Sequence, residues 1–496
     1  MRGISIASAP LPARTDAPRA DIALLVGRVR RKPGALPNAV LDALRERGWI
    51  AGNAQSWRPL HGRTRADIES LHDVAVPLAR IEDFDALFER GRGDGFDAAL
   101  AVAVAVFFAS GGRHAWIVRI GDPVAVSALG DPATLGQLIP GHAASAPVSA
   151  AERTSWHGMA HVLGVPEAAL LLLPDLPEYF AEPSVPVAEQ LLPALEIVPQ
   201  FVECTAPATT APASAEPYRP VTAPWLNDAG FAAWSAALQA AHTLLARLRP
   251  DMQLLAALPL PTPNLADNAP HASGLPGYLA QHEALLAAKQ LQLAWPWLVT
   301  DAAARLPGAL EAPDARLAGL IAATTLARGA HRTPAGTPTP AIRALVPHLA
   351  AHTPLAERLS VFADSATGIH LLSDVTTARE IAQRPANVRR VLGLVARAAR
   401  RIGDSVVFDA SGPALWRALR LAVERLLDGY WQAGALHGAT AADAYRVECG
   451  PTTMSQADID NGRTIVQISL APAASVERIA VTLTLDEGQT PQLEAA

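Results

Sequence analysis

Residues 384–416 read RPANVRRVLGLVARAARRIGDSVVFDASGPALW, and they open the most regular part of the sequence. Apolar residues recur with the helical period over 387–402, which predicts an amphipathic helix. A second helix is predicted from residue 413 to about residue 433, because proline is favoured at the first position of a helix. The segment 405–408 between them reads as a short strand. The stretch therefore predicts two helices joined by a strand.

Strands follow these helices toward the end of the sequence. They are predicted at residues 445–449, 464–470 and 478–485, with a turn of helix at 455–461. In the last strand, apolar residues alternate with polar or small ones, which is the period of a strand with one buried face. The apolar positions are Ile479, Val481, Leu483 and Leu485. The final third of the sequence is therefore predicted to mix helices and strands.

The beginning of the sequence has α/β character. A buried strand ending at Gly27 is followed by helices at 81–88 and 96–110 and by a strand at 114–120. After residue 120 Ala and Pro dominate, and the expected helices lie at 228–248, 281–293 and 317–327.

The whole chain has 496 residues, which is more than one hydrophobic core supports, so a multidomain α/β (α+β) protein is expected. Changes of texture divide it into an N-terminal arm with its connector (1–20), an N-terminal part of the core (21–120), a middle or outer domain with a mobile loop at 205–224 (121–355), a C-terminal core domain (356–485) and a tail (486–496).

Five short motifs follow one another in the C-terminal segment. They are Val388-Arg389-Arg390, DSVVF at 404–408, PALW at 413–416, WQAGALHGAT at 431–440 and DIDNGR at 458–463. None is specific alone, but their order resembles the C-terminal domain of contractile tail sheath proteins. This family serves myophage tails, R-type pyocins and extracellular contractile injection systems. Near the other end, FFASGG at 107–112 before WIVR at 116–119 is similar to the family's first segment.

The resemblance implies a structural subunit and not an enzyme. Sheath subunits polymerise as stacked hexameric rings around an inner tube, and they contract to drive the tube through a target envelope. The implied partners are further copies of the chain, the inner tube protein, and baseplate and cap proteins, with no cofactor. Assembly is expected in the cytoplasm, into a phage tail or a released tail-like particle. A minor sheath paralogue beside the baseplate or cap stays open.

The helix at 387–402 carries its arginines on one side. On a helical wheel they fall within an arc of about 120°, opposite the valines and Ile402, and no acidic residue interrupts them. These arginines are Arg389, Arg390, Arg397, Arg400 and Arg401. A solvated face is one interpretation, but like charges on one face repel unless a counter-surface is present. The resemblance implies that this face meets an acidic inner tube.

Strand exchange between subunits is the second expectation. Ile4 and Ile6 lie in a short strand-like segment that a Pro-rich connector separates from the rest. The resemblance implies that this segment and the strand at 478–485 pair with neighbouring subunits through backbone hydrogen bonds. The alternative is that 478–485 is simply the last strand of its own domain.

Composition and motifs exclude several other classes. The net charge of −6 gives no basic excess for nucleic acid, and the apolar runs are too short to insert in a membrane. Cys204 and Cys449 form no metal-binding pair, and no phosphate-binding glycine loop occurs.

One enzyme hypothesis remains. His157 and His161 stand four apart in HGMAH, so one helix face would present both to a metal ion. The glutamate that follows the first histidine in metalloprotease helices is missing, and Gly158 weakens the helix. A chance spacing is favoured, and a metal-dependent enzyme is the alternative from a different class.

Overall fold

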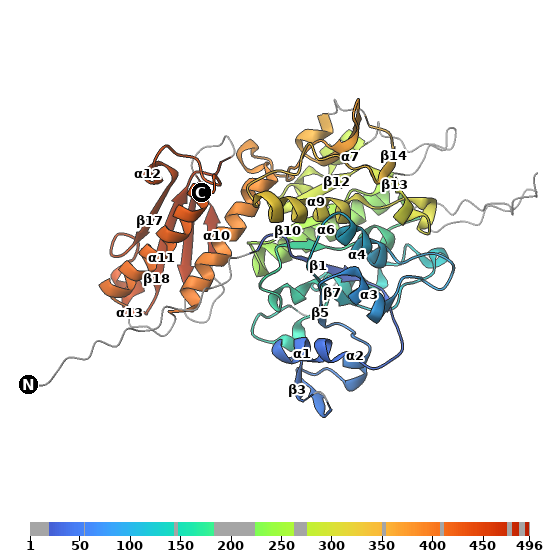
Figure 1. The fold of residues 1–496 in the computed structure, drawn as a ribbon, viewed down its shortest axis with the longest axis horizontal. Coiled ribbons are helices and arrows are strands. Elements are labelled where there is room, and N and C mark those ends of the chain that lie inside the picture. Colours follow the sequence, from blue (N-terminus) through green and yellow to red (C-terminus); the bar gives the residue numbers. More distant parts are fainter. Residues whose placement is uncertain are drawn as a thin grey trace, which may run out of the picture.

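The computed structural model describes residues 19–53, 55–142, 147–182, 224–261, 275–349, 354–406, 411–473, 479–485 and 492–495. These residues form a larger α/β body and a smaller C-terminal domain beside it (Figure 1). The expected mixed α/β, multidomain fold is confirmed.

One eight-stranded sheet is the centre of the larger body. Its order is β16-β15-β12-β10-β8-β1-β7-β5. The strands are β1 Ala23–Gly27, β5 Ala75–Leu78, β7 Ala115–Arg119, β8 Leu170–Leu172, β10 Gln253–Ala257, β12 Leu291–Trp295, β15 Ser360–Ser365 and β16 Gly368–Leu371. The inner six are mutually parallel, and the antiparallel strands β5 and β16 form the two edges. Strands such as LLL and LQLAW are buried throughout, as parallel strands covered on both faces must be.

Helices α4 (Ala99–Ala109) and α9 (Pro313–Arg328) pack on each other and on this sheet. The helices touch closely because Gly319 has no side chain. A Cβ there would lie 2.7 Å from the carbonyl oxygen of Phe107. The apolar run that predicts α4 is buried along most of its length.

The remaining elements of the body are shorter or peripheral. They are α1 Asn38–Glu46, α2 Arg65–Glu69, α3 Ile81–Leu87, α5 Leu135–Leu138, α6 Asp228–Leu248, α7 Leu275–Gln281 and α8 Glu283–Leu286, with the strand pairs β2 (Arg30–Arg31) and β6 (Phe88–Glu89), β3 (Ile50–Gly52) and β4 (Trp57–Pro59), β9 (Trp225–Leu226) and β11 (Leu260–Pro261), and β13 (Trp297–Thr300) and β14 (Ile342–Val346).

The C-terminal domain has two layers. A four-stranded antiparallel sheet has the order β17-β18-β19-β20, with β17 Tyr445–Cys449, β18 Thr464–Leu470, β19 Ile479–Leu485 and β20 Gln492–Ala495. Two long helices, α10 (Ala386–Asp404) and α11 (Pro413–Gln432), pack with this sheet around a second hydrophobic core. The short helices α12 (Ala441–Ala444) and α13 (Gln456–Asp460) lie in its connections.

Most predicted elements of the C-terminal domain are confirmed, and β17 and β18 begin and end where the sequence predicts. The strand expected at 405–408 is not seen in its described part, since Ser405 and Val406 form a turn and the rest lies outside the described residues. The helix expected at 281–293 is wrong. Within that range only Gln281, which ends α7, and Glu283–Leu286 are helical, and β12 then enters the sheet between β10 and β15.

The structure also corrects the domain boundaries. The large sheet takes strands from residue 23 to residue 371, so it crosses the boundaries expected at 120 and 355. One hydrophobic core serves these strands, and the second core begins only with α10. The two domains therefore meet near Ala386. The expected loop at 205–224 lies outside the described residues except for Pro224, and the expected tail contains β20.

Candidate functional site

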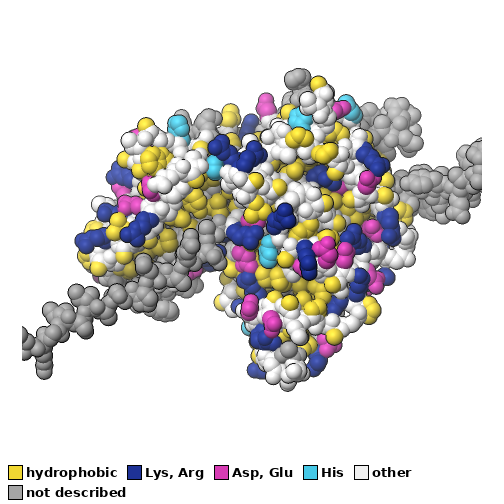
Figure 2. Space-filling model, viewed as in Figure 1, with side chains coloured by type: hydrophobic (Ala, Val, Ile, Leu, Met, Phe, Trp, Pro, Cys, Tyr) yellow, Lys and Arg dark blue, Asp and Glu magenta, His cyan; other side chains and the backbone are white. Residues whose placement is uncertain are grey.

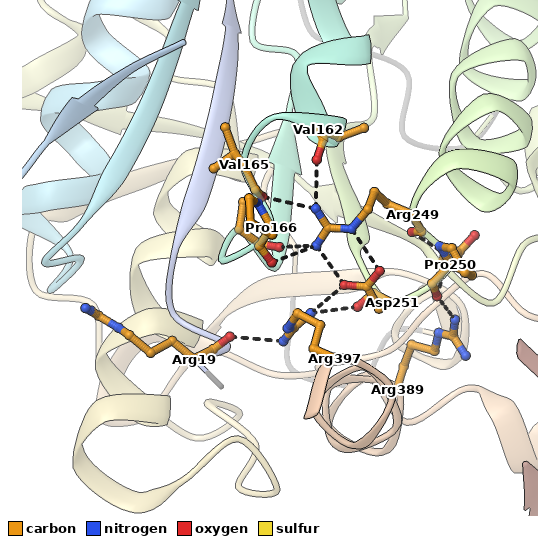
Figure 3. Close-up of polar contacts among 11 residues, drawn as sticks. Arg19, Val162, Val165, Pro166, Arg249, Pro250, Asp251, Arg389 and Arg397 are labelled. Carbon is orange, nitrogen blue, oxygen red and sulfur yellow. Dashed lines mark hydrogen bonds and ion pairs between the residues drawn. The ribbon is translucent and has the colours of Figure 1, made fainter. Parts of the chain in front are cut away.

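Helix α10 lies between the two domains, and both of its sides are covered. Its apolar side belongs to the core of the C-terminal domain, through Val388, Val391 and Val395. Its arginine side faces the larger body, where Arg397 reaches the turn that follows α6 (Figure 3). The helix therefore carries the junction between the domains.

Asp251 is the acidic centre of this junction. Its carboxylate accepts hydrogen bonds from Arg249 at 2.9 and 2.8 Å and from Nη1 of Arg397 at 3.1 Å. The same Nη1 reaches the backbone oxygen of Asp251 at 3.0 Å, and Nη2 donates to the backbone oxygen of Arg19 at 3.0 Å. One carboxylate thus joins an arginine of each domain.

Arg249 fixes this centre to the larger body. Its guanidinium donates to four backbone oxygens at 2.7 to 3.1 Å, those of Val162, Val165, Pro166 and Ala168. The arrangement is visible in Figure 3, where Arg249 lies between Asp251 and these carbonyl groups. Asp251 is therefore held by contacts within the larger body as well as by Arg397.

Two further arginines of α10 dock on the body. Arg390 forms a two-pronged pair with Asp374, at 3.1 and 2.5 Å, and Gln292 donates to the same carboxylate at 2.8 Å. Arg389 donates through Nη2 to the backbone oxygen of Pro250. Planar guanidinium groups suit such two-pronged binding better than lysine does.

These groups are charged although they are buried. Burial raises the pKa of Asp251, but Arg249 and Arg397 outweigh it and hold that pKa well below the usual value. Burial lowers the pKa of Arg397, and it lowers the pKa of Arg389 to about 10. A carboxylate among guanidinium groups is thus the state of this junction at neutral pH.

The expectation that all five arginines form an outward face is therefore wrong for three of them. Arg389, Arg390 and Arg397 are only 5%, 3% and 6% exposed. Arg400 and Arg401, near the C-terminal end of α10, are partly exposed. The wheel places the five correctly on one side but cannot show what covers that side.

One sequence signal could have shown this cover. Gly393 lies four residues from both Arg389 and Arg397, so it falls on the arginine side of the helix. A Cβ on Gly393 would meet the backbone oxygen of Asp251 at 2.3 Å. Glycine is costly inside a solvated helix, and its place among the arginines indicates close backbone contact.

The residues predicted to exchange strands fall into two groups. Ile4 and Ile6 lie outside the described residues. Ile479, Val481, Leu483 and Leu485 stand in β19 opposite Leu470, Ile468, Val466 and Thr464 of β18 in the same chain. The other edge of β19 pairs with β20, a strand that the sequence analysis missed. Pairing between subunits therefore remains a prediction.

The paired histidines do converge, but on a carboxylate that is already bound. Asp73 accepts from His157 Nδ1 at 2.6 Å, His161 Nε2 at 3.1 Å and the backbone N–H of Gly158 at 2.9 Å. Arg63 contacts the same carboxylate at 2.8 Å. Burial raises the pKa of Asp73, but His161, His157 and Arg63 together hold it well below its usual value.

This cluster suits ion pairing better than metal binding. Both oxygens of Asp73 already accept hydrogen bonds and Arg63 pairs with one of them, so a metal ion would compete with a cation that is already there. Among the residues that the structure describes, no group of three or more His, Cys, Asp or Glu side chains is arranged to hold a metal ion. The cluster holds the 157–163 segment against the loop at Asp73.

The outer surface adds one feature to the candidate site. Figure 2 shows arginine side chains, in dark blue, on the face of the C-terminal domain where α11 lies, since this domain contains no lysine. The exposed arginines of α11 are Arg417, Arg420 and Arg425. In the described part of the chain, no helix is both long and apolar enough to cross a membrane.

Comparison with known proteins gives structural likeness only. No protein-family model and no curated protein matches the chain. The anti-feeding prophage (AFP) baseplate in its contracted state contains a similar chain, with 18% identity, a TM-score of 0.59 and 99% of both chains covered. The contracted PVC sheath complex, an extracellular contractile injection system, gives 16% identity, a TM-score of 0.54 and coverage of 95% and 94%.

The contracted AFP helical sheath is similar to the same extent, with 19% identity, a TM-score of 0.52 and 96% of both chains covered. The likeness spans nearly the whole length of each chain. The resemblance seen in the ordered motifs is thereby confirmed at the level of the fold: the chain has the fold of contractile tail sheath proteins.

Proposed function

We propose that the chain is a structural subunit of a contractile sheath. It polymerises as stacked rings around an inner tube, joins baseplate and cap proteins at the ends, and contracts to drive the tube through a target envelope. The observation that carries this proposal is the likeness to the AFP and PVC sheaths over nearly the whole of both chains. The proposed role is assembly within a phage tail or tail-like particle, without catalysis.

The proposed contact with the tube uses the arginines left at the surface. Arg400 and Arg401 lie near the C-terminal end of α10, and the exposed arginines of α11 lie in the same helical layer of the domain. A screened attraction of this kind sets register and orientation more than affinity, which suits a sheath that must release its tube. The buried arginines of α10 instead hold the domain that presents this surface.

Electron microscopy of the purified protein, alone and co-expressed with the cognate tube protein, tests the proposal. Tubular or ring-like polymers are expected. Persistent monomers under both conditions would overturn it. The paired change Arg400→Glu with Arg401→Glu should abolish assembly on the tube while the subunit still folds, and the exposed Arg58→Glu serves as the control.

Strand exchange is proposed for the N-terminal segment, and for β19 where a neighbouring subunit replaces its pairing with β18 or β20. Deleting residues 1–7 should leave the subunit folded but prevent polymer growth. Assembly at the wild-type rate and length would show that this segment does not pair with a neighbour. Alanine substitution of residues 1–7 at constant length separates lost pairing from a shortened connector.

A sheath paralogue beside the baseplate is the second candidate function. The TM-score is 0.59 with the AFP baseplate structure and 0.52 with the AFP helical sheath. Quantitative mass spectrometry of intact particles distinguishes the two candidates. A main sheath protein is present in many copies that scale with particle length, whereas a paralogue at the baseplate keeps a small fixed number.

A further inference from the structure

The N-terminal end of α9 covers a small cavity inside the larger body. The cavity has a volume of about 30 Å³, which is room for one or two water molecules. Its walls come from α4, the turn at Pro174–Glu178 and the segment before α9. Three of its lining residues carry carboxyl groups, namely Glu178, Glu311 and Asp314.

Two of these three carboxylates are neutralised by arginine. Glu311 accepts from Arg316 at 2.8 and 2.9 Å and from the hydroxyl of Thr300 at 2.5 Å. Glu178 forms a buried ion pair with Arg92. Both cations are thus committed to other carboxylates and leave Asp314 without one.

Asp314 is the third carboxyl group, and it is only 2% exposed. Its carboxyl group accepts a hydrogen bond from the backbone N–H of Ala315 at 2.9 Å, and no cationic side chain in the described ranges forms an ion pair with it. A buried carboxylate without a cation is strongly disfavoured, so the neutral form is preferred. Burial raises the pKa of Asp314 to about 7, with a smaller contribution from the charge of Glu311 and against the backbone hydrogen bonds.

We propose that Asp314 is a proton-controlled latch that holds the start of α9 against α4 while its carboxyl group is neutral. When Asp314 loses its proton, an unpaired negative charge lies beside the cavity. Water solvates this charge by entering beside α9, which moves the helix away from α4. Opening therefore releases a proton, and the closed state is favoured at low pH.

The C-terminal end of α9 leads to the junction between the two domains. At its other end the chain continues to His331, whose backbone oxygen accepts from Asn387 of α10 at 2.8 Å. The short segment that follows α9 therefore contacts the helix that holds the C-terminal domain.

The two protonation states of Asp314 determine how the opening equilibrium changes with pH. An exposed aspartate has a pKa near 4, so between about pH 4 and pH 7 the open and unfolded states have lost a proton that the closed state keeps. Each pH unit in this interval favours opening about tenfold, and the effect is complete above about pH 7.

Urea unfolding of wild type and Asp314→Asn at pH 5 and pH 8 tests the latch. The unfolding constant of the wild type divided by that of Asp314→Asn should rise about 100-fold from pH 5 to pH 8. Only the wild type has the Asp314 proton to lose on unfolding. Asp175, which is buried with a pKa raised to about 6, titrates in both proteins and cancels in the ratio. Asp228→Asn, in the exposed first turn of α6, is the matched control.

A ratio that stays constant from pH 5 to pH 8 would overturn the proposal. Should the variant fail to fold, amide exchange of the wild type still decides it. The amide exchange of residues 317–320, which follow the first turn of α9, is compared with that of α6, so that the intrinsic pH dependence of exchange cancels. This relative rate should rise with pH up to about pH 7, and an unchanged relative rate would contradict the latch.

Discussion

Arg397 and Asp251 lie 146 positions apart in the chain and form an ion pair of 3.1 Å that joins the two domains. The side chains of both are below one-tenth exposed. Because Arg249 binds the other side of the same carboxylate, the pair is part of a three-residue cluster and not an isolated contact. The sequence shows Arg397 as one member of a charged helix face, and the structure shows that this face is an internal surface.

Replacing Arg397 should cost stability, not assembly alone. Arg397→Met removes one partner of a buried ion pair, and we expect a loss of about 3 kcal/mol in the free energy of unfolding. Arg400→Met, one turn further along the same helix, should change it by less than about 0.5 kcal/mol. Urea unfolding measures both. Equal losses of stability in Arg397→Met and Arg400→Met would contradict the distinction between buried and exposed arginines on α10.

Gly393 tests how closely α10 packs on the larger body. Gly393→Ala favours the helix locally, but its Cβ would meet the backbone oxygen of Asp251 at 2.3 Å. We expect a net loss of about 1–3 kcal/mol in the free energy of unfolding. Gly429→Ala in α11 is the matched control, because nothing lies within 4 Å of its Cβ position. That change should stabilise by up to about 1 kcal/mol.

The acid limit of the junction follows from the lowered pKa of Asp251. A carboxylate with a lowered pKa contributes stability above its unfolded pKa of about 4, and this contribution is lost as the pH falls further. The stability difference between wild type and Asp251→Asn should therefore be constant from pH 8 to pH 5 and shrink below pH 4. Thermal unfolding across this range provides the check. Shrinkage already between pH 8 and pH 6 would show that Asp251 is not held by both arginines.

The cluster around Asp73 should be independent of metal. Arg63 is its cation, so chelator should leave the melting temperature unchanged and elemental analysis should find no stoichiometric zinc. Asp73→Ala should destabilise by about 3 kcal/mol, because it leaves Arg63 buried without its carboxylate. His157→Ala should cost less, since the His157 side chain is 49% exposed. A melting temperature that falls with chelator would revive the metal-dependent hypothesis.

Local patterns in the sequence predict the C-terminal elements well. The alternation in β18 and β19 and the proline at the start of α11 are short-range signals that tertiary contacts reinforce. Helix α6 likewise begins and ends where its pattern predicts. The ordered motifs predict the fold as a whole, although no curated protein matches the chain.

The features that local sequence patterns do not predict depend on contacts between residues far apart in the chain. Strand β12 has a short apolar run that suits a helix or a buried strand equally, and its place between β10 and β15 decides the matter. The domain boundary at Ala386 depends on β15 and β16 joining a sheet whose other strands begin at residue 23. The cover of Arg390 comes from Asp374, and no local pattern links these two residues.

The two kinds of arginine on α10 differ in how they respond to ionic strength. Salt screens exposed charges over roughly 10 Å at 0.1 M, but it reaches buried pairs poorly. Added salt should therefore weaken a contact made by Arg400 and Arg401 while the pair of Arg397 with Asp251 persists. Under the proposed function, one helix would provide an outer contact with the tube that dissolved ions loosen and an inner contact that they leave intact, so added salt is expected to separate the sheath from its tube while every subunit stays folded.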